Sequence, residues 1–183
     1  MIHFPLCAGL ILVTLGWIVY RYFVYRKTGK LSTKQELLQL LFLINLLVLY
    51  RITFHPFAKV DGKVQPLIFS FASVWPFRTN LIPFVNLTDY DSRRDLLLNV
   101  IGNSTMFIPT GILTPILYKK RNTFFKVVTT GFLISLVIEI IQLPFAVRCS
   151  DVDDLILNTI GCAVGYGIYA LATCRKRSGL RAK

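Results

Sequence analysis

The sequence contains few charged residues. Only 16% of its 183 residues are Asp, Glu, Lys or Arg, whereas soluble globular domains typically carry about 25%. Acidic residues number nine, and there are only two histidines. Hydrophobic residues make up 54% of the chain, and the mean hydropathy is +0.59. This composition excludes a soluble enzyme and a disordered tail protein, because neither class is so apolar.

Several familiar functional motifs are also absent. His3 and His55 form no HExxH motif, and the four cysteines form no CxxC pair. The sequence has no internal repeat of the kind that marks many secondary transporters. A disulfide between Cys7 and Cys149 is conceivable, but cysteine is also a common buried apolar residue, and we do not expect this bridge. We expect no cofactor.

The apolar residues gather in long blocks, each of roughly 20 residues, enough to cross a hydrocarbon layer of about 30 Å as a helix. The blocks are Phe4–Tyr25, Leu37–Phe54, Leu96–Tyr118, Phe124–Phe145 and Leu155–Cys174. Together they account for more than half of the chain, which leaves no room for an independent soluble domain. The sequence predicts an all-α membrane protein with about five transmembrane helices, not a membrane β-barrel.

The distribution of basic residues predicts the orientation. Fourteen of the 21 Lys and Arg residues lie after blocks one, three and five or at the block ends beside those connections, which share one side of the membrane if every block spans. Short loops rich in Lys and Arg remain in the cytoplasm. We therefore expect the N-terminus outside and the C-terminus in the cytoplasm, with the first block retained as an anchor rather than cleaved as a signal peptide. This explanation of the net charge of +12 disfavours a nucleic-acid partner.

We expect three segments. Residues 1–34 would form an N-terminal anchor helix and a basic cytoplasmic loop, residues 35–174 the membrane domain, and residues 175–183 a basic cytoplasmic tail. Within the membrane domain, residues 55–95 would form a long outer loop in which aromatic residues and prolines alternate with few charges. Two interpretations of this loop stay open: it lies along the membrane surface, or it forms a lid over a site.

Polar residues within the apolar blocks predict a site, because polar groups in a bilayer need a partner or a function. Asn99 and Asn103 lie four residues apart, hence on one helix face near the outer surface. Glu139 and Gln142 lie three apart near the outer end of the fourth block, and Asp154 and Asn158 share a face at the start of the fifth. Arg148 and Asp151 lie in the short connection between these two blocks. All eight predict one polar cavity that opens outward.

Structural roles remain as alternatives. Asparagine and glutamine hold membrane helices together through hydrogen bonds of about 0.6–2 kcal/mol, and Glu139 with Arg148 could form a simple ion pair. Asp151, Asp153 and Asp154 could bind Mg²⁺, but acidic residues also stabilise a helix N-terminus through its dipole, which we favour, so no metal site is predicted. For Gly161, Gly165 and Gly167 we expect close helix packing.

Five motifs in order resemble the VanZ-like family over roughly residues 37–172. They are Asn80-Leu81-Ile82-Pro83-Phe84; Asn99 and Asn103 with Phe107-Ile108-Pro109-Thr110-Gly111; Ser135, Glu139 and Gln142; Arg148, Asp151, Asp153 and Asp154; and Asn158-Thr159 with Gly161 and Gly165. The long outer loop before Asn80 departs from the family pattern. The resemblance implies a multi-pass protein of the bacterial cytoplasmic membrane. It also suggests a role in antibiotic resistance, because the family's named member confers low-level resistance to teicoplanin, a lipid-tailed glycopeptide.

Two functional classes follow. In the first, the protein is not an enzyme, and it binds an amphiphile, such as a lipoglycopeptide or a cell-wall lipid, or limits its access. In the second, it is an intramembrane enzyme acting on a lipid-linked substrate, with Glu139 as general base and Arg148 holding an anionic head group. We favour the first, with membrane lipids as further partners. The predicted ligand-binding residues are Asn80, Asn99, Asn103, Glu139, Gln142, Arg148, Asp151, Asp154 and Asn158.

Overall fold

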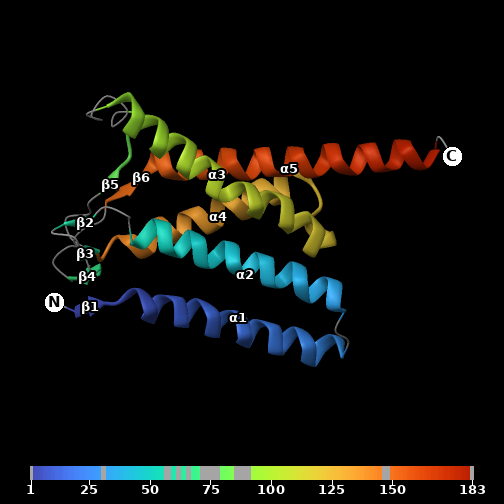
Figure 1. Cartoon of the computed structure of the whole chain (residues 1–183), viewed down its shortest axis with the longest axis horizontal. Coiled ribbons are helices and arrows are strands. Elements are labelled where there is room, and N and C mark those ends of the chain that lie inside the picture. Colours follow the sequence, from blue (N-terminus) through green and yellow to red (C-terminus); the bar gives the residue numbers. More distant parts are fainter. Residues whose placement is uncertain are drawn as a thin grey trace. The chain divides into compact units, whose positions relative to one another are not determined.

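Five long apolar helices dominate the structure, a computed structural model that describes residues 2–29, 32–55, 59–60, 63–64, 67–70, 79–84, 92–145 and 149–181. The helices are α1 (Leu6–Thr28), α2 (Thr33–Phe54), α3 (Arg93–Leu117), α4 (Phe124–Gln142) and α5 (Val152–Arg181) (Figure 1). Each contains a stretch long and apolar enough to cross a membrane. The prediction of an all-α protein with five helices long and apolar enough to span a membrane is therefore confirmed.

The chain divides into two compact units. Unit 1 comprises residues 1–80 and 138–150, and unit 2 comprises residues 81–137 and 151–183. Helix α4 begins in unit 2 and ends in unit 1, whereas every other long helix belongs to one unit.

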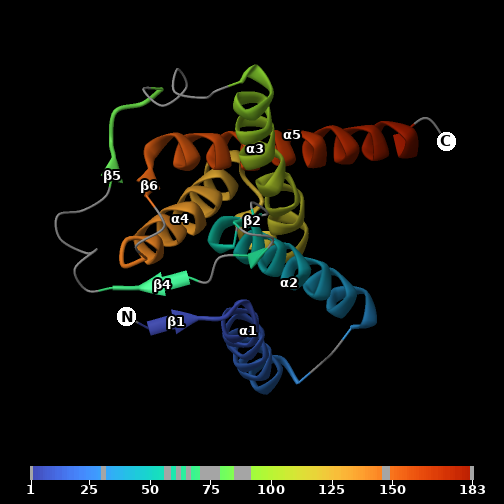
Figure 2. The ribbon, with the colours of Figure 1, turned by 60° about the vertical axis from the view of Figure 1, so that its left-hand side comes forward.

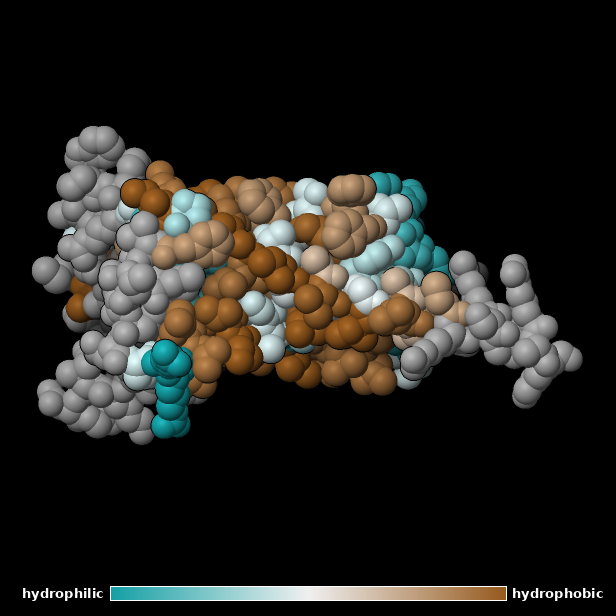
Figure 3. All heavy atoms as spheres, turned by 90° about the horizontal axis from the view of Figure 1, so that it is seen from above, coloured by the Kyte–Doolittle hydropathy of each residue, from teal (hydrophilic) through white to brown (hydrophobic). Residues whose placement is uncertain are grey.

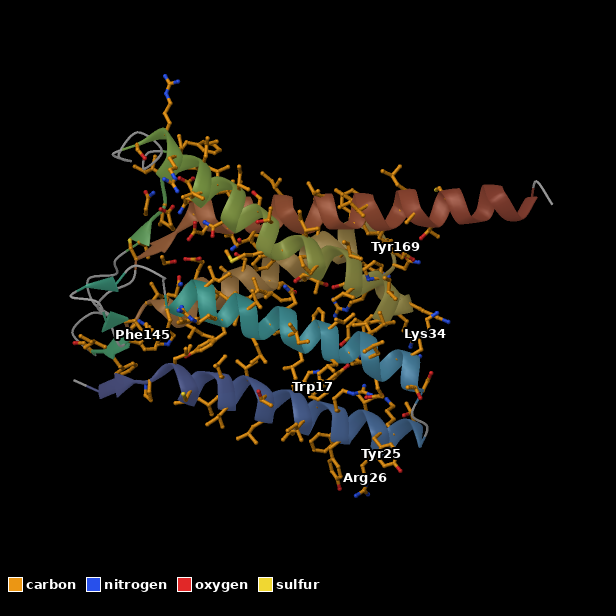
Figure 4. The ribbon with its side chains drawn as sticks, in the orientation of Figure 1. Trp17, Tyr25, Arg26, Lys34, Phe145 and Tyr169 are labelled. Carbon is orange, nitrogen blue, oxygen red and sulfur yellow. The ribbon has the colours of Figure 1, made fainter. Side chains whose placement is uncertain are left out.

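In unit 1, α1 and α2 form a helical hairpin and lie side by side (Figures 1 and 2). An ion pair joins Arg21 of α1 to Glu36 of α2 near the connection between the helices. Near the other end, Gly9 permits close approach, because a Cβ there would stand 1.9 Å from the Tyr50 hydroxyl oxygen. Figure 4 shows Tyr25, Arg26 and Lys34 at the joined end, so the basic residues predicted between the first two blocks gather there.

The opposite end of unit 1 is closed by short strands and aromatic side chains. Strand β1 (Ile2–Phe4) pairs antiparallel with β4 (Leu67–Phe69), with Ile2 opposite Phe69. Strands β2 (Lys59–Val60) and β3 (Lys63–Val64) form a second antiparallel pair. The Phe145 ring, labelled in Figure 4, contacts the rings of Phe54 and Phe69, each at a centroid distance of 6.0 Å. This part of the predicted outer loop is therefore packed against unit 1.

Other parts of that loop are less fully described. Strand β5 (Thr79–Asn80) pairs with β6 (Ser150–Asp151). Phe71, Trp75 and Phe77, whose aromatic character predicted a membrane-associated loop, lie outside the described residues. Cys7 and Cys149, both in unit 1, are exposed, and no disulfide joins them.

In unit 2, α3 and α5 pack closely (Figure 1) through glycines that allow the two backbones to touch. A Cβ at Gly161 would stand 1.8 Å from the Ser104 carbonyl oxygen, and one at Gly165 would stand 2.2 Å from the Ile108 carbonyl oxygen. The packing role predicted for these two glycines is confirmed. The expectation for Gly167 is wrong: within the described residues nothing lies within 4 Å of its Cβ position, because it projects away from the α3 contact.

The outward faces of α3 and α5 are apolar, as the lipid-facing side of spanning helices must be. Figure 3 shows hydrophobic side chains predominating over the middle of this face. The exposed apolar residues include Leu97, Leu98 and Ile101 of α3, and Ile160, Val164, Ile168 and Leu171 of α5. Unit 2 is completed by a 3₁₀ turn, η3 (Lys119–Arg121), which carries three basic residues between α3 and α4.

Candidate functional site

The N-terminus of α5 gathers acidic side chains in unit 2. Asp151 precedes the helix, and its carboxylate accepts a hydrogen bond of 2.9 Å from the backbone N–H of Asp153. This is an N-cap, a contact that typically contributes about 0.5–2 kcal/mol. Asp153 and Asp154 occupy the first turn, where the helix dipole favours negative charge. The capping chemistry thus accounts for why the helix begins here.

Asp153 also holds the segment that carries the first family-like motif. Its Oδ1 atom accepts a hydrogen bond of 2.8 Å from the backbone N–H of Phe84. Phe84 adopts a left-handed conformation with φ of 66°, which is uncommon for a bulky residue, and the contact from Asp153 helps to fix it. Residues 81–84 are therefore attached to the start of α5, although 69 residues separate the two partners in sequence.

A chain of side-chain hydrogen bonds links α3 to α5 in unit 2. The amide nitrogen of Asn103 donates to Asp154 Oδ1 and lies 3.4 Å from Asn99 Oδ1. The structure thus brings together three of the predicted site residues, as their spacing of four residues along α3 indicated. Asn103 and Asp154 are both half-buried, so the pair lies at the margin of the helix contact and not deep within it.

Asn158 lies one turn further along α5 than Asp154, where it contacts α4. Its side-chain nitrogen donates a hydrogen bond of 2.9 Å to Ser135 Oγ, and both residues are buried. Within the described part of the chain, the buried side-chain oxygens without a hydrogen-bond partner are Gln39 Oε1, Thr114 Oγ1, Asp153 Oδ2 and Asn158 Oδ1, and the last two lie near the start of α5. Buried polar atoms normally have partners, so these two oxygens indicate a position where a ligand or water could bind.

Two further predicted site residues lie in unit 1, near the end of α4. Glu139 and Gln142 are 5% and 6% exposed, which agrees with a buried, polar face at this end of the helix. The Gln142 side chain donates a hydrogen bond of 2.9 Å to the carbonyl oxygen of Thr53 at the end of α2. Gln142 therefore has a structural contact within unit 1, of the kind that joins membrane helices.

The remaining predicted site residues are Asn80 and Arg148. Asn80 lies in β5 and is half-buried. Arg148 lies outside the described residues, so its pairing with Glu139 stays a prediction. The single cavity predicted from eight of the site residues likewise stays a prediction, because five of the eight belong to unit 2 and the other three to unit 1.

Comparison with known proteins identifies the family. The family model described as VanZ/LLP1 matches residues 42–173. The chain belongs to the VanZ/LLP1 family. Protein VanZ of Enterococcus faecium is 33% identical over 127 residues, which cover 69% of this chain and 73% of that protein. No solved structure matches the chain.

The VanZ/LLP1 match contains every predicted site residue and omits α1. It runs from the second quarter of α2 through α3 and α4 and ends within α5. The first and fourth motifs of the family resemblance meet in the hydrogen bond from Phe84 to Asp153. Because this contact joins two motifs that are distant in sequence, Asp153 is a candidate ligand-binding residue, although the sequence analysis considered it only as a possible Mg²⁺ ligand and as part of a family motif.

The sequence analysis also missed buried polar residues outside the expected outer cluster. Gln39 and Asn45 of α2 are buried, as are Thr110 and Thr114 of α3. His55 is 1% exposed, with its Nε2 atom 3.3 Å from the Tyr50 hydroxyl oxygen. Asn45 could have been identified from the sequence, because an asparagine inside an apolar run is as unusual in the second block as in the third. No group of three or more potential metal-ligating side chains is found among the described residues.

Proposed function

We propose that this VanZ/LLP1-family protein is a non-enzymatic component of the bacterial cytoplasmic membrane that binds a lipid-tailed amphiphile or limits its access. The ligand class would be glycopeptides of the teicoplanin type, and the outcome would be tolerance of the antibiotic. Family membership and the similarity to Protein VanZ support the antibiotic-resistance function, and the membrane character of the five helices supports the amphiphile.

One structural observation carries the proposal. The N-terminal end of α5 combines the hydrogen-bonded chain of Asn99, Asn103 and Asp154 with the unpartnered buried oxygen of Asp153. Amides and carboxylates grouped in this way can accept and donate hydrogen bonds to a polar head group. The adjoining helix faces are apolar and exposed, which suits a lipid tail.

The proposal includes the orientation and the remaining site residues. The N-terminus would lie outside and the C-terminus in the cytoplasm, so that the start of α5 faces the outer leaflet, where a glycopeptide arrives. Residues 1–34 would anchor the protein, residues 35–174 would form the functional domain, and residues 175–183 would lie in the cytoplasm. Asn80, Glu139, Gln142, Arg148, Asp151 and Asn158 would complete the site.

Drug tolerance in a sensitive Gram-positive host tests this function. We expect expression to raise tolerance of teicoplanin more than that of vancomycin, because only teicoplanin carries an acyl tail. Asp153→Asn should reduce the effect while membrane protein levels stay normal, since an amide retains an acceptor for the Phe84 N–H. Thr173→Val, near the other end of α5, is the matched control. Equal shifts for the two antibiotics, or no shift, would contradict the proposal.

A further inference from the structure

A second feature of unit 2 lies on the opposite side of α3 from the polar chain. Arg94 and Asn103 are nine residues apart, about two and a half turns of an α-helix, so they point in opposite directions from the helix axis. Asn103 faces Asp154 of α5. On the Arg94 side, Leu97, Leu98 and Ile101 are 55%, 61% and 55% exposed. The two faces of α3 therefore differ in both chemistry and accessibility.

This side of α3 carries a groove of about 460 Å³, a volume within the range of roughly 300–1,000 Å³ typical of small-molecule sites. Its described lining residues are Arg94, Leu97, Leu98, Ile101 and Gly102. The space beside Gly102 is open, because among the described residues no heavy atom lies within 4 Å of the position that its Cβ would occupy. The walls are apolar apart from the arginine.

The position of Arg94 distinguishes the groove from an ordinary lipid-facing surface. Arg93 and Arg94 are the first two residues of α3, where the positive end of the helix dipole disfavours cations. An anion bound there would be attracted by the guanidinium group and by the helix terminus together. A groove with apolar walls and a cation at one end therefore has a complementary ligand: an acyl chain with an anionic head group.

We propose that this groove binds an anionic glycerophospholipid, with one acyl chain over Leu98, Ile101 and Gly102 and its phosphate beside Arg94. The groove opens on a face of a spanning helix, so membrane lipid has direct access to it. The proposed site lies away from the polar residues at the start of α5 and does not depend on the antibiotic-related function. It would hold a structural lipid against α3.

Filling the groove tests the acyl-chain part of the proposal. The full-length protein, reconstituted in nanodiscs of phosphatidylcholine with a small fraction of phosphatidylglycerol, should enrich phosphatidylglycerol on extraction into detergent, as measured by native mass spectrometry. Gly102→Leu should reduce that retention roughly tenfold, the effect of losing about 1.4 kcal/mol of binding free energy. The fold should persist, since leucine is the better helix former. Retention unchanged in Gly102→Leu would overturn the proposal.

Gly167→Leu is the matched control, because Gly167 of α5 also has nothing within 4 Å of its Cβ position among the described residues, and it lines no part of this groove. It should retain phosphatidylglycerol like the unchanged protein. If Gly167→Leu loses retention to the same extent as Gly102→Leu, the effect is not specific to the groove and the proposal is wrong.

Replacing each arginine separately tests whether the lipid phosphate binds beside Arg94. Arg94→Gln should lower the preference for phosphatidylglycerol over phosphatidylcholine roughly tenfold, whereas Arg93→Gln, which removes the same charge from a neighbour outside the groove, should lower it much less. Equal losses in the two variants would mean that the lipid responds to overall positive charge and not to this site, and would overturn the proposal.

Discussion

Several polar side chains of this protein form hydrogen bonds with one another or with the backbone of a neighbouring helix. Asn103 bonds to Asp154, Asn158 to Ser135 and Gln142 to the backbone of Thr53. In a bilayer such contacts are typically worth about 0.6–2 kcal/mol each, so they contribute to the stability of the units that contain them. The unpartnered oxygens of Asp153 and Asn158 differ, because a buried acceptor without a partner is destabilising unless something binds there.

The contact between Asn103 and Asp154 can be tested by removing one partner. Asn103→Leu should lower the free energy of unfolding of the detergent-solubilised protein by about 1–2 kcal/mol, because the Asp154 carboxylate then loses the hydrogen bond from Asn103. Thr105→Val is the control, since the Thr105 hydroxyl is exposed and bonds to carbonyl oxygens of its own helix. A thermal melt of both variants measures the difference. Equal melting temperatures would mean that the contact is energetically neutral.

A second prediction for individual residues concerns the ion pair expected between Glu139 and Arg148. Glu139 is buried, and Arg148 follows nine residues later, beyond Pro144, which favours a turn of the chain. We expect Glu139→Gln and Arg148→Gln each to abolish teicoplanin tolerance, because removing one partner leaves an unpaired charge. If the pair is part of the working site, the double variant should recover expression but not tolerance.

The measurement is a double-mutant cycle scored on both membrane protein level and drug tolerance. Recovery of both quantities in the double variant would mean that the pair is only structural. Additive, independent losses would show that the two side chains never meet, and would contradict the predicted coupling.

At the scale of helices, the sequence predicted most elements because their signal is physical and local. A run of about 20 apolar residues can only be satisfied as a spanning helix, so the five blocks match the five helices within a few residues, although α5 continues through the basic tail to Arg181. The partner of each helix was less predictable. Gly161 and Gly167 look alike in sequence, yet only Gly161 contacts α3.

Alanine substitutions at these two glycines should have opposite effects. In Gly161→Ala the new Cβ would overlap the Ser104 carbonyl oxygen, and we expect the protein to lose about 1–3 kcal/mol of stability as α3 and α5 move apart. Gly167→Ala meets open space and should gain about 0.5–1 kcal/mol through better helix propensity. Thermal unfolding in detergent distinguishes the two. Equal shifts would exclude close packing at Gly161.

For the whole molecule, the central prediction is the orientation in the membrane. A reporter that is active only outside the cytoplasm should be silent when fused after Arg177 and active when inserted within residues 59–63. The reason is that the short connections rich in Lys and Arg stay in the cytoplasm. Activity of the fusion after Arg177 would reverse the orientation and place the start of α5 on the cytoplasmic side, which would also remove the basis for an outward-facing site.

The sequence alone determined the class of protein, the number of spanning helices and the family. The lengths of the apolar runs and the order of the motifs are properties of the chain itself, and they do not depend on how the helices pack. Only the tertiary structure decided which polar residues meet: Asn103 finds Asp154, Asn158 finds Ser135, and Asp153 holds the backbone of Phe84. These contacts depend on how helices distant in sequence are rotated and staggered, because a shift of one residue turns a side chain by about 100°.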